Sequence, residues 1–278
     1  MEIGLALAGG GVRGAAHIGA IKALEENDIK ISHIAGTSAG SIVSALYAMG
    51  YSTKEMIKLF EYFAKEIMEI NPRYIFSSIR KQKSVKLRGL ASSFSIENGI
   101  KQTAKLKDIK NISDIKMPIA IPATDLLKNR KIVFTNQNLK GDYYINDIEV
   151  GKAVRASANF PGMYEPFEYG EYQFVDGGIF DNLPVAELKK MNSNKVLAIK
   201  FDVDNPKRQN TMYNISMKSL DLMQDNLMQD SIKLSDFCLS IDLRDVKVFN
   251  YNKVDFCYEE GYKQTLEQID KIKEKLIT

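Results

Sequence analysis

Two glycine-rich turns interrupt the first part of the chain, and each follows a short apolar run and precedes a helical pattern. Ile3–Ala8 leads through one turn into a helix expected over Ala15–Glu26, and Ser32–Ala35 leads through the other into Ser41–Met49. Two strands that are each followed by a helix need a crossover, which places them parallel in one sheet. The pattern therefore predicts an α/β fold with a largely parallel sheet.

The same alternation of strand and helix patterns continues to the end of the chain. Ser52 and Thr53 are suitable caps for a third helix, and the last helix is expected over Tyr258–Leu276. No repeat or low-complexity linker divides the chain, so we expect one domain over residues 1–278, with its central sheet flanked by helices. The later strands are expected at Pro118–Ala123, Lys131–Thr135, Tyr172–Val175, Val196–Phe201 and Cys238–Leu243.

Composition excludes several classes of protein. The 278 residues include two cysteines and two histidines, too few for a disulfide scaffold or a histidine-rich metal site. A net charge of +3 argues against a dedicated nucleic-acid binder. We find no charged leader with a cleavage site and no run of ~20 apolar residues. We therefore expect a cytoplasmic protein, with peripheral contact to a membrane left open.

The first glycine turn, Gly9–Gly14, has the spacing G-x-G-x-x-G between a strand and a helix. A dinucleotide-binding oxidoreductase would also need an acidic residue ~20 positions later, at the end of the second strand. That strand runs into Gly36 instead, which disfavours the nucleotide hypothesis. The turn still offers backbone N–H groups to an anion, including a transient oxyanion.

The second turn, Gly36-Thr37-Ser38-Ala39-Gly40, matches G-x-S-x-G between a predicted strand and a predicted helix. This is the context of a nucleophile elbow, in which a serine hydroxyl projects from a sharp turn. The alternative is that Thr37 or Ser38 only caps the following helix. The motif alone does not decide between catalysis and capping.

The histidines bear on this choice, because a nucleophilic serine needs a base. No histidine follows His33, so the serine–acid–histidine order of α/β-hydrolases is not possible, and we expect structural roles for His17 and His33. Asp176 ends a predicted strand before Gly177 and Gly178 and offers a carboxylate as the base. A simple turn is the alternative for this segment. Asp181-Asn182-Leu183-Pro184, just beyond it, is expected to cap a helix.

Taken together, these motifs resemble the patatin-like phospholipase family. The likeness extends to Ala8–Gly19, Ile119–Leu126, Val154–Gly162 and Asp176–Pro184. It covers about residues 2–203, and we expect residues 204–278 to complete the same domain. The resemblance implies an α/β fold whose nucleophile elbow lies between a strand and a helix.

The resemblance also implies the chemistry. Ser38 would be the nucleophile and Asp176 the general base of a Ser–Asp dyad, and no metal or other cofactor would be needed. The substrate would be a phospholipid or another acyl ester, cleaved as by a phospholipase A or lysophospholipase. A catalytically silent lipid-binding protein and a general carboxylesterase are the alternatives. The implied oxyanion hole is Gly9, Gly10 and Gly11, and the supporting motif residues are Arg13, Gly14, Gly36, Gly40, Gly177 and Gly178.

Three further segments bear on lipid binding. The basic run Arg80–Arg88 is suited to anionic headgroups, although a solvated loop is the favoured interpretation. The methionine-rich stretch Met212–Met228 is either a cover for an acyl chain or, as favoured, ordinary core. The apolar group Phe160, Met163, Tyr164 and Phe167 is a candidate acyl pocket. Headgroup, chain length and oligomeric state are not predicted.

Overall fold

The computed structural model describes residues 2–68, 91–202, 208–244 and 246–277. Within them, nine strands form one sheet, in which β5, β4, β3, β2, β1, β8 and β9 follow one another and β7 and β6 extend from β3. The strands are β1 Glu2–Leu7, β2 Lys30–Gly36, β3 Ile119–Asp125, β4 Arg130–Thr135, β5 Tyr144–Ile145, β6 Phe167–Tyr169, β7 Tyr172–Asp176, β8 Val196–Phe201 and β9 Phe237–Ile241.

The sheet is mixed but mostly parallel, as the sequence predicts. β1 pairs in parallel with β2 and β8, β2 with β3, and β8 with β9. The sequence did not indicate that β4 and β7 are antiparallel to β3, or that β5 and β6 exist. The prediction of a single last helix was also wrong. Gln268 has non-helical backbone angles (φ −108°, ψ 4°) and separates two helices.

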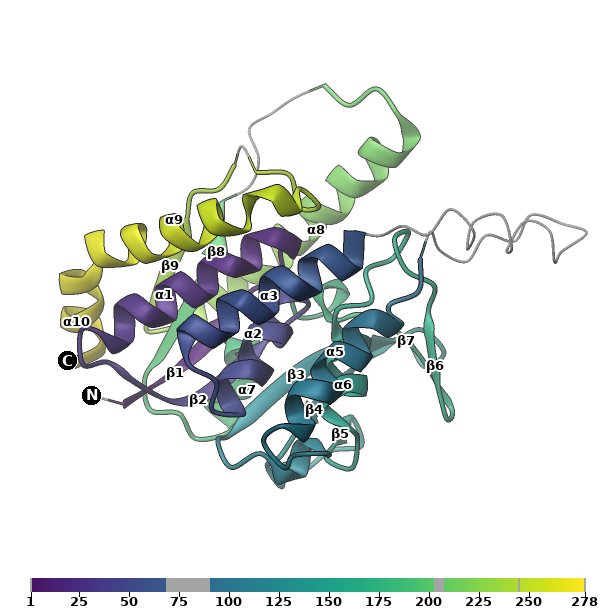
Figure 1. The fold of residues 1–278 in the computed structure, drawn as a ribbon, viewed down its shortest axis with the longest axis horizontal. Helices are drawn as coiled ribbons and strands as arrows, with labels where there is room; N and C mark the ends of the chain where they lie inside the picture. Colours follow the sequence, from purple (N-terminus) through teal and green to yellow (C-terminus); the bar gives the residue numbers. More distant parts are fainter. Residues whose placement is uncertain (1, 69–90, 203–207, 245, 278) are drawn as a thin grey trace, which may run out of the picture.

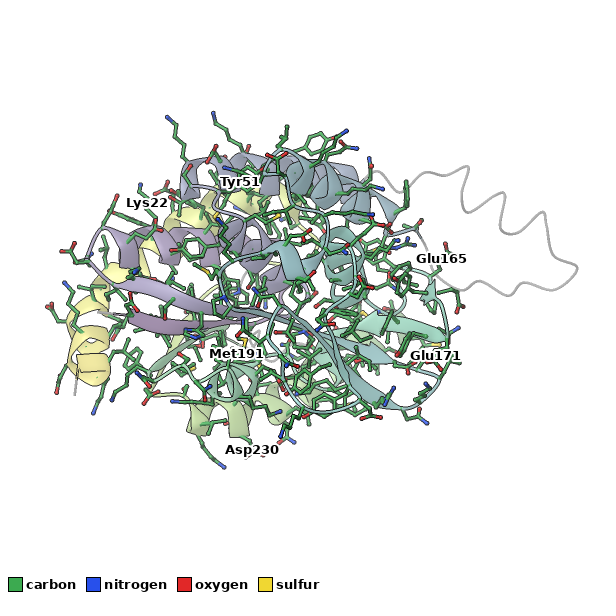
Figure 2. All side chains as sticks on the ribbon, turned by 90° about the horizontal axis from the view of Figure 1, so that it is seen from below. Lys22, Tyr51, Glu165, Glu171, Met191 and Asp230 are labelled. Atoms are coloured by element: carbon green, nitrogen blue, oxygen red, sulfur yellow. The ribbon has the colours of Figure 1, made fainter. Side chains whose placement is uncertain are left out.

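Helices cover both faces of the sheet and make three layers (Figures 1 and 2). Most of the helices pack on one face of the sheet and contribute to one apolar cluster. Helices α7 and α8 pack on the other face. Of the described residues, the helices are α1 Ala15–Glu25, α2 Ala39–Ala48, α3 Thr53–Met68, α5 Phe94–Lys105, α6 Val150–Ser157, α7 Val185–Lys190, α8 Met212–Leu234, α9 Val254–Glu267 and α10 Ile269–Ile277.

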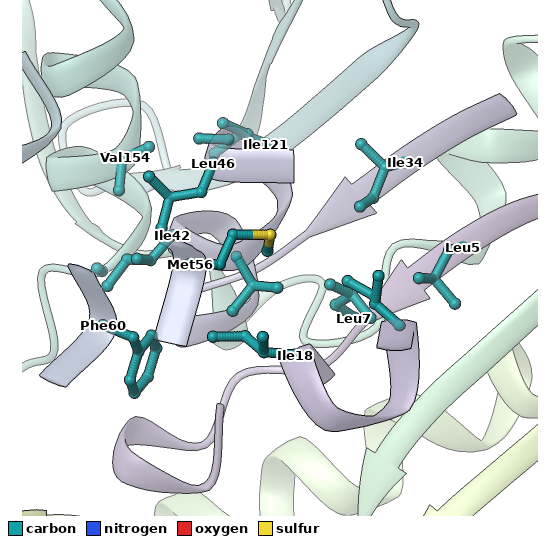
Figure 3. Close-up of a cluster of buried hydrophobic side chains, with 14 of the residues drawn as sticks. Leu5, Leu7, Ile18, Ile34, Ile42, Leu46, Met56, Phe60, Ile121 and Val154 are labelled. Atoms are coloured by element: carbon teal, nitrogen blue, oxygen red, sulfur yellow. The ribbon is translucent and has the colours of Figure 1, made fainter. Parts of the chain in front are cut away.

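The two sheet faces carry side chains of different size. Successive residues of a strand point to opposite faces. Leu5 and Leu7 therefore join the cluster beneath α1 and α2 (Figure 3), while Ala6 and Ala8 belong to the cluster that includes α7. Burying each large side chain contributes about 1.5–3 kcal/mol. Small side chains on the other face let α7 approach the sheet closely.

Two strands that are distant in sequence end beside each other on one edge of β3. β2 runs parallel to β3 and pairs with it up to Ala120, whereas β7 runs antiparallel and ends where Asp176 pairs with Ala123. Their carboxyl ends therefore meet near Pro122. A Cβ atom on Gly177 would overlap the Pro122 carbonyl oxygen, so only glycine fits where the two strand ends converge.

Two segments were expected from the sequence to bear on lipid binding. The basic run Arg80–Arg88 lies outside the described residues. The expectation that Met212–Met228 forms ordinary core is wrong, because α8 buries Met228 and leaves Met212 and Met223 exposed. Among the helices of the described residues, none combines the length and the apolar character needed to cross a bilayer.

Helices α1 and α9 are in backbone contact, which ties the end of the chain to its beginning. A Cβ atom on Gly261 of α9 would overlap the carbonyl oxygen of Ala16, and one on Gly19 of α1 would overlap that of Tyr258. Each helix therefore presents a glycine to the backbone of the other. This close approach leaves no room for a side chain at either position.

The contact predicts that Gly261→Ala destabilises the protein by about 2 kcal/mol, even though alanine is the better helix former by ~1 kcal/mol. Urea unfolding measures the change. Glu259→Ala, at an exposed position of the same helix, is the control and should stay within about 0.5 kcal/mol of the wild type. Equal stability of Gly261→Ala and the wild type would contradict the described packing.

Candidate active site

Ser38 occupies a strained turn between β2 and α2. Its φ of +54° and ψ of −122° lie in a region that side-chain-bearing residues rarely adopt. Although Ser38 is at the N-cap position of α2, its hydroxyl makes no cap hydrogen bond. Its N–H donates to Ser157 Oγ at 3.0 Å, and its carbonyl accepts from Ser41 Oγ at 2.6 Å. The turn is therefore held by the backbone and by neighbouring serines, while the Ser38 hydroxyl is left for the cavity.

The two glycines of the elbow allow this turn to pack tightly. A Cβ atom on Gly40 would lie 2.5 Å from the Leu7 carbonyl oxygen, and one on Gly36 would overlap the carbonyl oxygen of Gly40. These approaches bring the start of α2 against the end of β1. The glycine turn after β1 thus lies directly beside Ser38.

Asp176 is buried at the end of β7 and faces Ser38. Its Oδ1 accepts the Gly178 N–H at 2.8 Å, whereas its Oδ2 is buried with no hydrogen-bond partner among the described residues. Burial raises the pKa of this carboxyl from 3.8 to about 6, and interactions with the Ser38 hydroxyl and the Gly178 N–H only partly oppose the shift. The site therefore holds a carboxylate of increased basicity, with one oxygen free to accept a proton.

The glycine turn directs its N–H groups in two ways. The Gly9 N–H donates to Asn182, 3.3 Å from the carbonyl oxygen and 3.2 Å from Oδ1. The expectation that Gly9 contributes to an oxyanion hole is therefore corrected, because its N–H is already engaged. The N–H groups of Gly10 and Gly11 have no acceptor among the described residues, and both glycines line the cavity with Ser38 and Asp176.

Asp181 and Asn182, expected only to cap a helix, instead fasten the two turns together. Thr37 Oγ1 donates to the Asp181 carbonyl oxygen at 2.7 Å, and Asn182 accepts from Gly9. The Asp181 carboxylate is buried against Lys131 Nζ at 2.8 Å. The D-G-G segment and the residues after it therefore hold both the elbow and the glycine turn, a role that only the tertiary contacts reveal.

Arg13 links the glycine turn to the end of the chain. Its guanidinium donates to the Val246 carbonyl oxygen at 2.9 and 2.7 Å, and the Val12 N–H donates to the Val248 carbonyl oxygen at 2.9 Å. Gly14 packs so that a Cβ atom would lie 2.8 Å from Ala39 Cβ. The segment before α9 therefore closes over the turn that the sequence singled out.

Neither histidine lines the cavity. His17 is fully buried, its Nε2 lies 2.8 Å from the Ala8 carbonyl oxygen, and burial lowers its pKa to about 4. His33 lies in β2 before the elbow, with Nδ1 2.9 Å from Ser32 Oγ. Both side chains thus take part in packing and hydrogen bonding away from Ser38.

A cavity of about 500 Å³ opens over Ser38 and Asp176, within the size range of small-molecule sites. One wall is apolar and includes Phe60 and Phe63 of α3 and Ile42 of α2. Of the expected acyl-pocket group, Phe160 and Tyr164 line the cavity, whereas Met163 and Phe167 do not. No group of three or more histidine, cysteine or acidic residues in the described ranges is arranged to hold a metal.

The opposite wall comes from residues 208–251, which the sequence left without a role. It comprises the inward side of α8 and the segment between β9 and α9, with Met217, Gln224, Val248 and Phe249 among its members. Only the Met212–Met228 stretch gave any hint of this, through its alternative interpretation as a cover. The cavity is thus shared between an early and a late part of the chain.

A mostly parallel mixed sheet, a strained serine elbow and a glycine turn at the same strand ends define a patatin-like α/β fold. The chain belongs to the patatin-like phospholipase family, whose sequence model matches residues 5–189. The matched part contains Ser38, Asp176 and the glycine turn, and ends before α8. The cavity wall from residues 208–251 therefore lies outside the family match.

Related proteins support the same assignment. The uncharacterized protein YqhO of Bacillus subtilis is 31% identical over 207 residues, which span 72% of this chain and 71% of that protein. Lysophospholipase NTE1 of Meyerozyma guilliermondii is 31% identical over 201 residues, 71% of this chain but only 12% of the fungal enzyme. The chain thus corresponds to a small part of that much longer protein.

Solved structures share the fold at low sequence identity. VipD from Legionella pneumophila superposes with a TM-score of 0.55 at 16% identity, covering 97% of this chain and 67% of VipD. Human GIVD cytosolic phospholipase A2 superposes with a TM-score of 0.52 at 10% identity, covering 99% of this chain and 58% of that one. At these identities the likeness concerns the fold alone.

The strained backbone at Ser38 predicts that Ser38→Gly is about 1 kcal/mol more stable than Ser38→Ala, because glycine relieves the positive φ while alanine keeps it. Thermal or urea unfolding compares the two variants. Ser219, exposed on α8, provides the matched control, where the order should reverse because glycine is the poorer helix former. A less stable Ser38→Gly protein would argue against a strained elbow.

Proposed function

We propose that the protein is a serine acyl hydrolase of lipids, with Ser38 as nucleophile and Asp176 as general base. The observation that carries this proposal is the buried, basic Asp176 carboxylate beside a strained serine, with one carboxylate oxygen unpartnered. A group held in this way is suited to accept a proton during reaction. Membership of the patatin-like phospholipase family supports the same assignment.

In the first step, Asp176 Oδ2 takes the Ser38 proton as Ser38 Oγ forms a bond to the ester carbonyl carbon. The carbonyl oxygen becomes an oxyanion, which the Gly10 and Gly11 N–H groups stabilise. Each such donor typically contributes ~10²–10³ in rate. The tetrahedral intermediate then breaks its bond to the alcohol oxygen. Asp176 returns the proton to that oxygen, and the acyl group stays on Ser38.

In the second step, Asp176 takes a proton from water as the water oxygen attacks the acyl-enzyme. The same two N–H groups stabilise the second oxyanion. The bond to Ser38 Oγ breaks, Asp176 returns the proton to Ser38, and the fatty acid leaves. The dyad is then restored, because Asp176 has alternated between base and acid in each half of the reaction.

The shape and lining of the cavity support a lipid acyl ester as the substrate. Its apolar wall suits a hydrocarbon chain, and Phe60, Phe63 and Phe160 provide much of that surface. The relatives named above include a lysophospholipase. We therefore propose cleavage of phospholipid or lysophospholipid acyl esters.

The dyad predicts that Ser38→Ala and Asp176→Asn each lower ester turnover by at least about 10³-fold. A lipid-like fluorophosphonate should add once to the wild type and not to Ser38→Ala, as intact mass would show. Asp176→Asn should also be at least as stable as the wild type at neutral pH. The raised Asp176 pKa corresponds to about 3 kcal/mol spent on ionising a buried carboxylate, which asparagine avoids.

These variants separate the proposal from its alternatives. Near-wild-type turnover in either variant would exclude the dyad. A fluorophosphonate adduct on both wild type and Ser38→Ala would identify another serine, and no adduct on either would favour a silent lipid-binding protein.

The raised pKa of Asp176 also predicts the pH dependence of hydrolysis. The base works only when deprotonated, so kcat/KM should fall as pH drops through about 6, about tenfold per pH unit below that value, and level off above it. A soluble short-chain ester avoids changes in lipid packing during the titration. Full activity down to the ordinary pKa of an aspartic acid would contradict the role of Asp176 or its burial.

A further inference from the structure

The outward side of α8 is apolar. Met212 is 86% exposed and Met223 62% exposed, and Ile215, Leu222 and Leu227 are exposed beside them. At 100° per residue these positions fall on one side of the helix, opposite the side that lines the cavity. We call these five residues the α8 outer face.

Between Met212 and Leu227 the charged side chains of this helix lie on the other side, whereas Asp230 and Lys233, beyond the α8 outer face, are exposed. Lys218 and Asp221 line the cavity, and Asp225 is half-buried one turn further on. Between the first and last residues of the α8 outer face, the remaining outward positions are Ser216, Ser219 and Asn226, which carry no charge. From Met212 to Leu227 the helix is therefore amphipathic in the reverse sense of one that packs on a core, with charge toward the protein and apolar side chains toward solvent.

A concentration of apolar side chains of this kind marks an interaction surface. Large exposed apolar residues elsewhere in the described chain lie on other elements, such as Phe94 in α5, Phe256 in α9, and Leu106 and Leu127 in turns. The α8 outer face instead forms a strip along one side of a single helix, with Ser216 and Ser219 between its two apolar groups. It belongs to the same helix that walls the cavity, so whatever covers the strip lies beside the cavity.

The mouth of the cavity next to α8 is rich in cations. Arg208, Arg244 and Lys247 are exposed and line the cavity, and half-buried Lys218 adds a fourth positive charge. Of these cations, Arg244 is ion-paired with the exposed carboxylate of Asp242. Asp221 is the carboxylate that accompanies them among the described lining residues at this end. Phosphate groups at a surface complement such a rim, each cation near an anionic surface contributing about 1 kcal/mol.

We propose that the α8 outer face docks on a lipid surface that carries phosphate headgroups, with the cavity mouth turned toward it. The proposal rests on the lipid hydrolase function proposed above. An apolar helix face lying in the headgroup region is the usual mode of interfacial binding. A second copy of the chain fits less well, because a two-fold contact through this face would bring two cationic rims together.

Vesicle flotation tests the docking directly. The protein carries Ser38→Ala, so that lipid is not consumed, and the vesicles contain phosphatidylcholine and phosphatidylglycerol. The double variant Leu222→Gln/Met223→Gln should bind about 100-fold more weakly, because each large apolar side chain removed from water is worth about tenfold or more. The matched control is Leu106→Gln/Leu127→Gln, which should bind as the parent does.

Kinetics on two substrates separate docking from chemistry. For the kinetics Ser38 is left intact. The Leu222→Gln/Met223→Gln variant should then lose turnover of vesicle phospholipid and keep turnover of a soluble short-chain ester. Equal loss on both substrates would overturn the proposal, because α8 would then act on the site itself. If the wild type shows no Ser38-dependent turnover of either ester, the proposed function fails, and flotation still decides the docking.

Two further results would overturn the proposal. One is undiminished vesicle binding by the double variant. The other is a wild-type dimer, seen by sedimentation, that the double variant dissociates, because the α8 outer face would then be a contact between copies of the chain.

Discussion

The site depends on one constraint of sheet geometry: two strands of opposite direction end against each other on the same edge of β3. β2 brings Ser38 to this point from the early part of the chain, and β7 brings Asp176 from the opposite direction. Neither strand can be extended without colliding with the other, so each must turn away sharply. The glycines after both strands, Gly40 and Gly177, make those turns possible. The strained serine and the buried acid thus follow from the meeting of these two strand ends on one edge of β3.

The turn at Asp181 and Asn182 keeps this arrangement in register. It receives a hydrogen bond from the elbow and another from the glycine turn, and a buried ion pair with Lys131 secures it to β4. A shift of either turn would break contacts with this common anchor. Rigidity of this kind suits the proposed reaction, because N–H donors that are already oriented toward an oxyanion need no rearrangement.

The sequence predicted the strands, the first helices and the two motif turns well, because apolar runs, glycines and caps are local signals. It could not show that β7 is antiparallel or that the helix expected at the end breaks at Gln268, since partner strands and neighbouring helices decide these features. The N–H of Gly9 illustrates the limit within the site. Its motif position was identified correctly, but only the tertiary structure shows that Asn182 accepts its hydrogen bond. The Met212–Met228 stretch was assigned to the core because helical spacing does not reveal which side faces the protein.

The family match ends at residue 189, whereas α8 and the segment before α9 build one wall of the cavity. Ser38, Asp176 and the glycine turn therefore lie within the family match, whereas part of the surface that lines the cavity lies in a later stretch of the chain. Substitutions on the inward side of α8 can alter the shape of the cavity without changing the strand ends that hold Ser38 and Asp176. Such a division allows relatives to diversify in substrate choice without having to rebuild their chemistry. It also suggests exchanging residues 208–251 between homologues as a route to new selectivity.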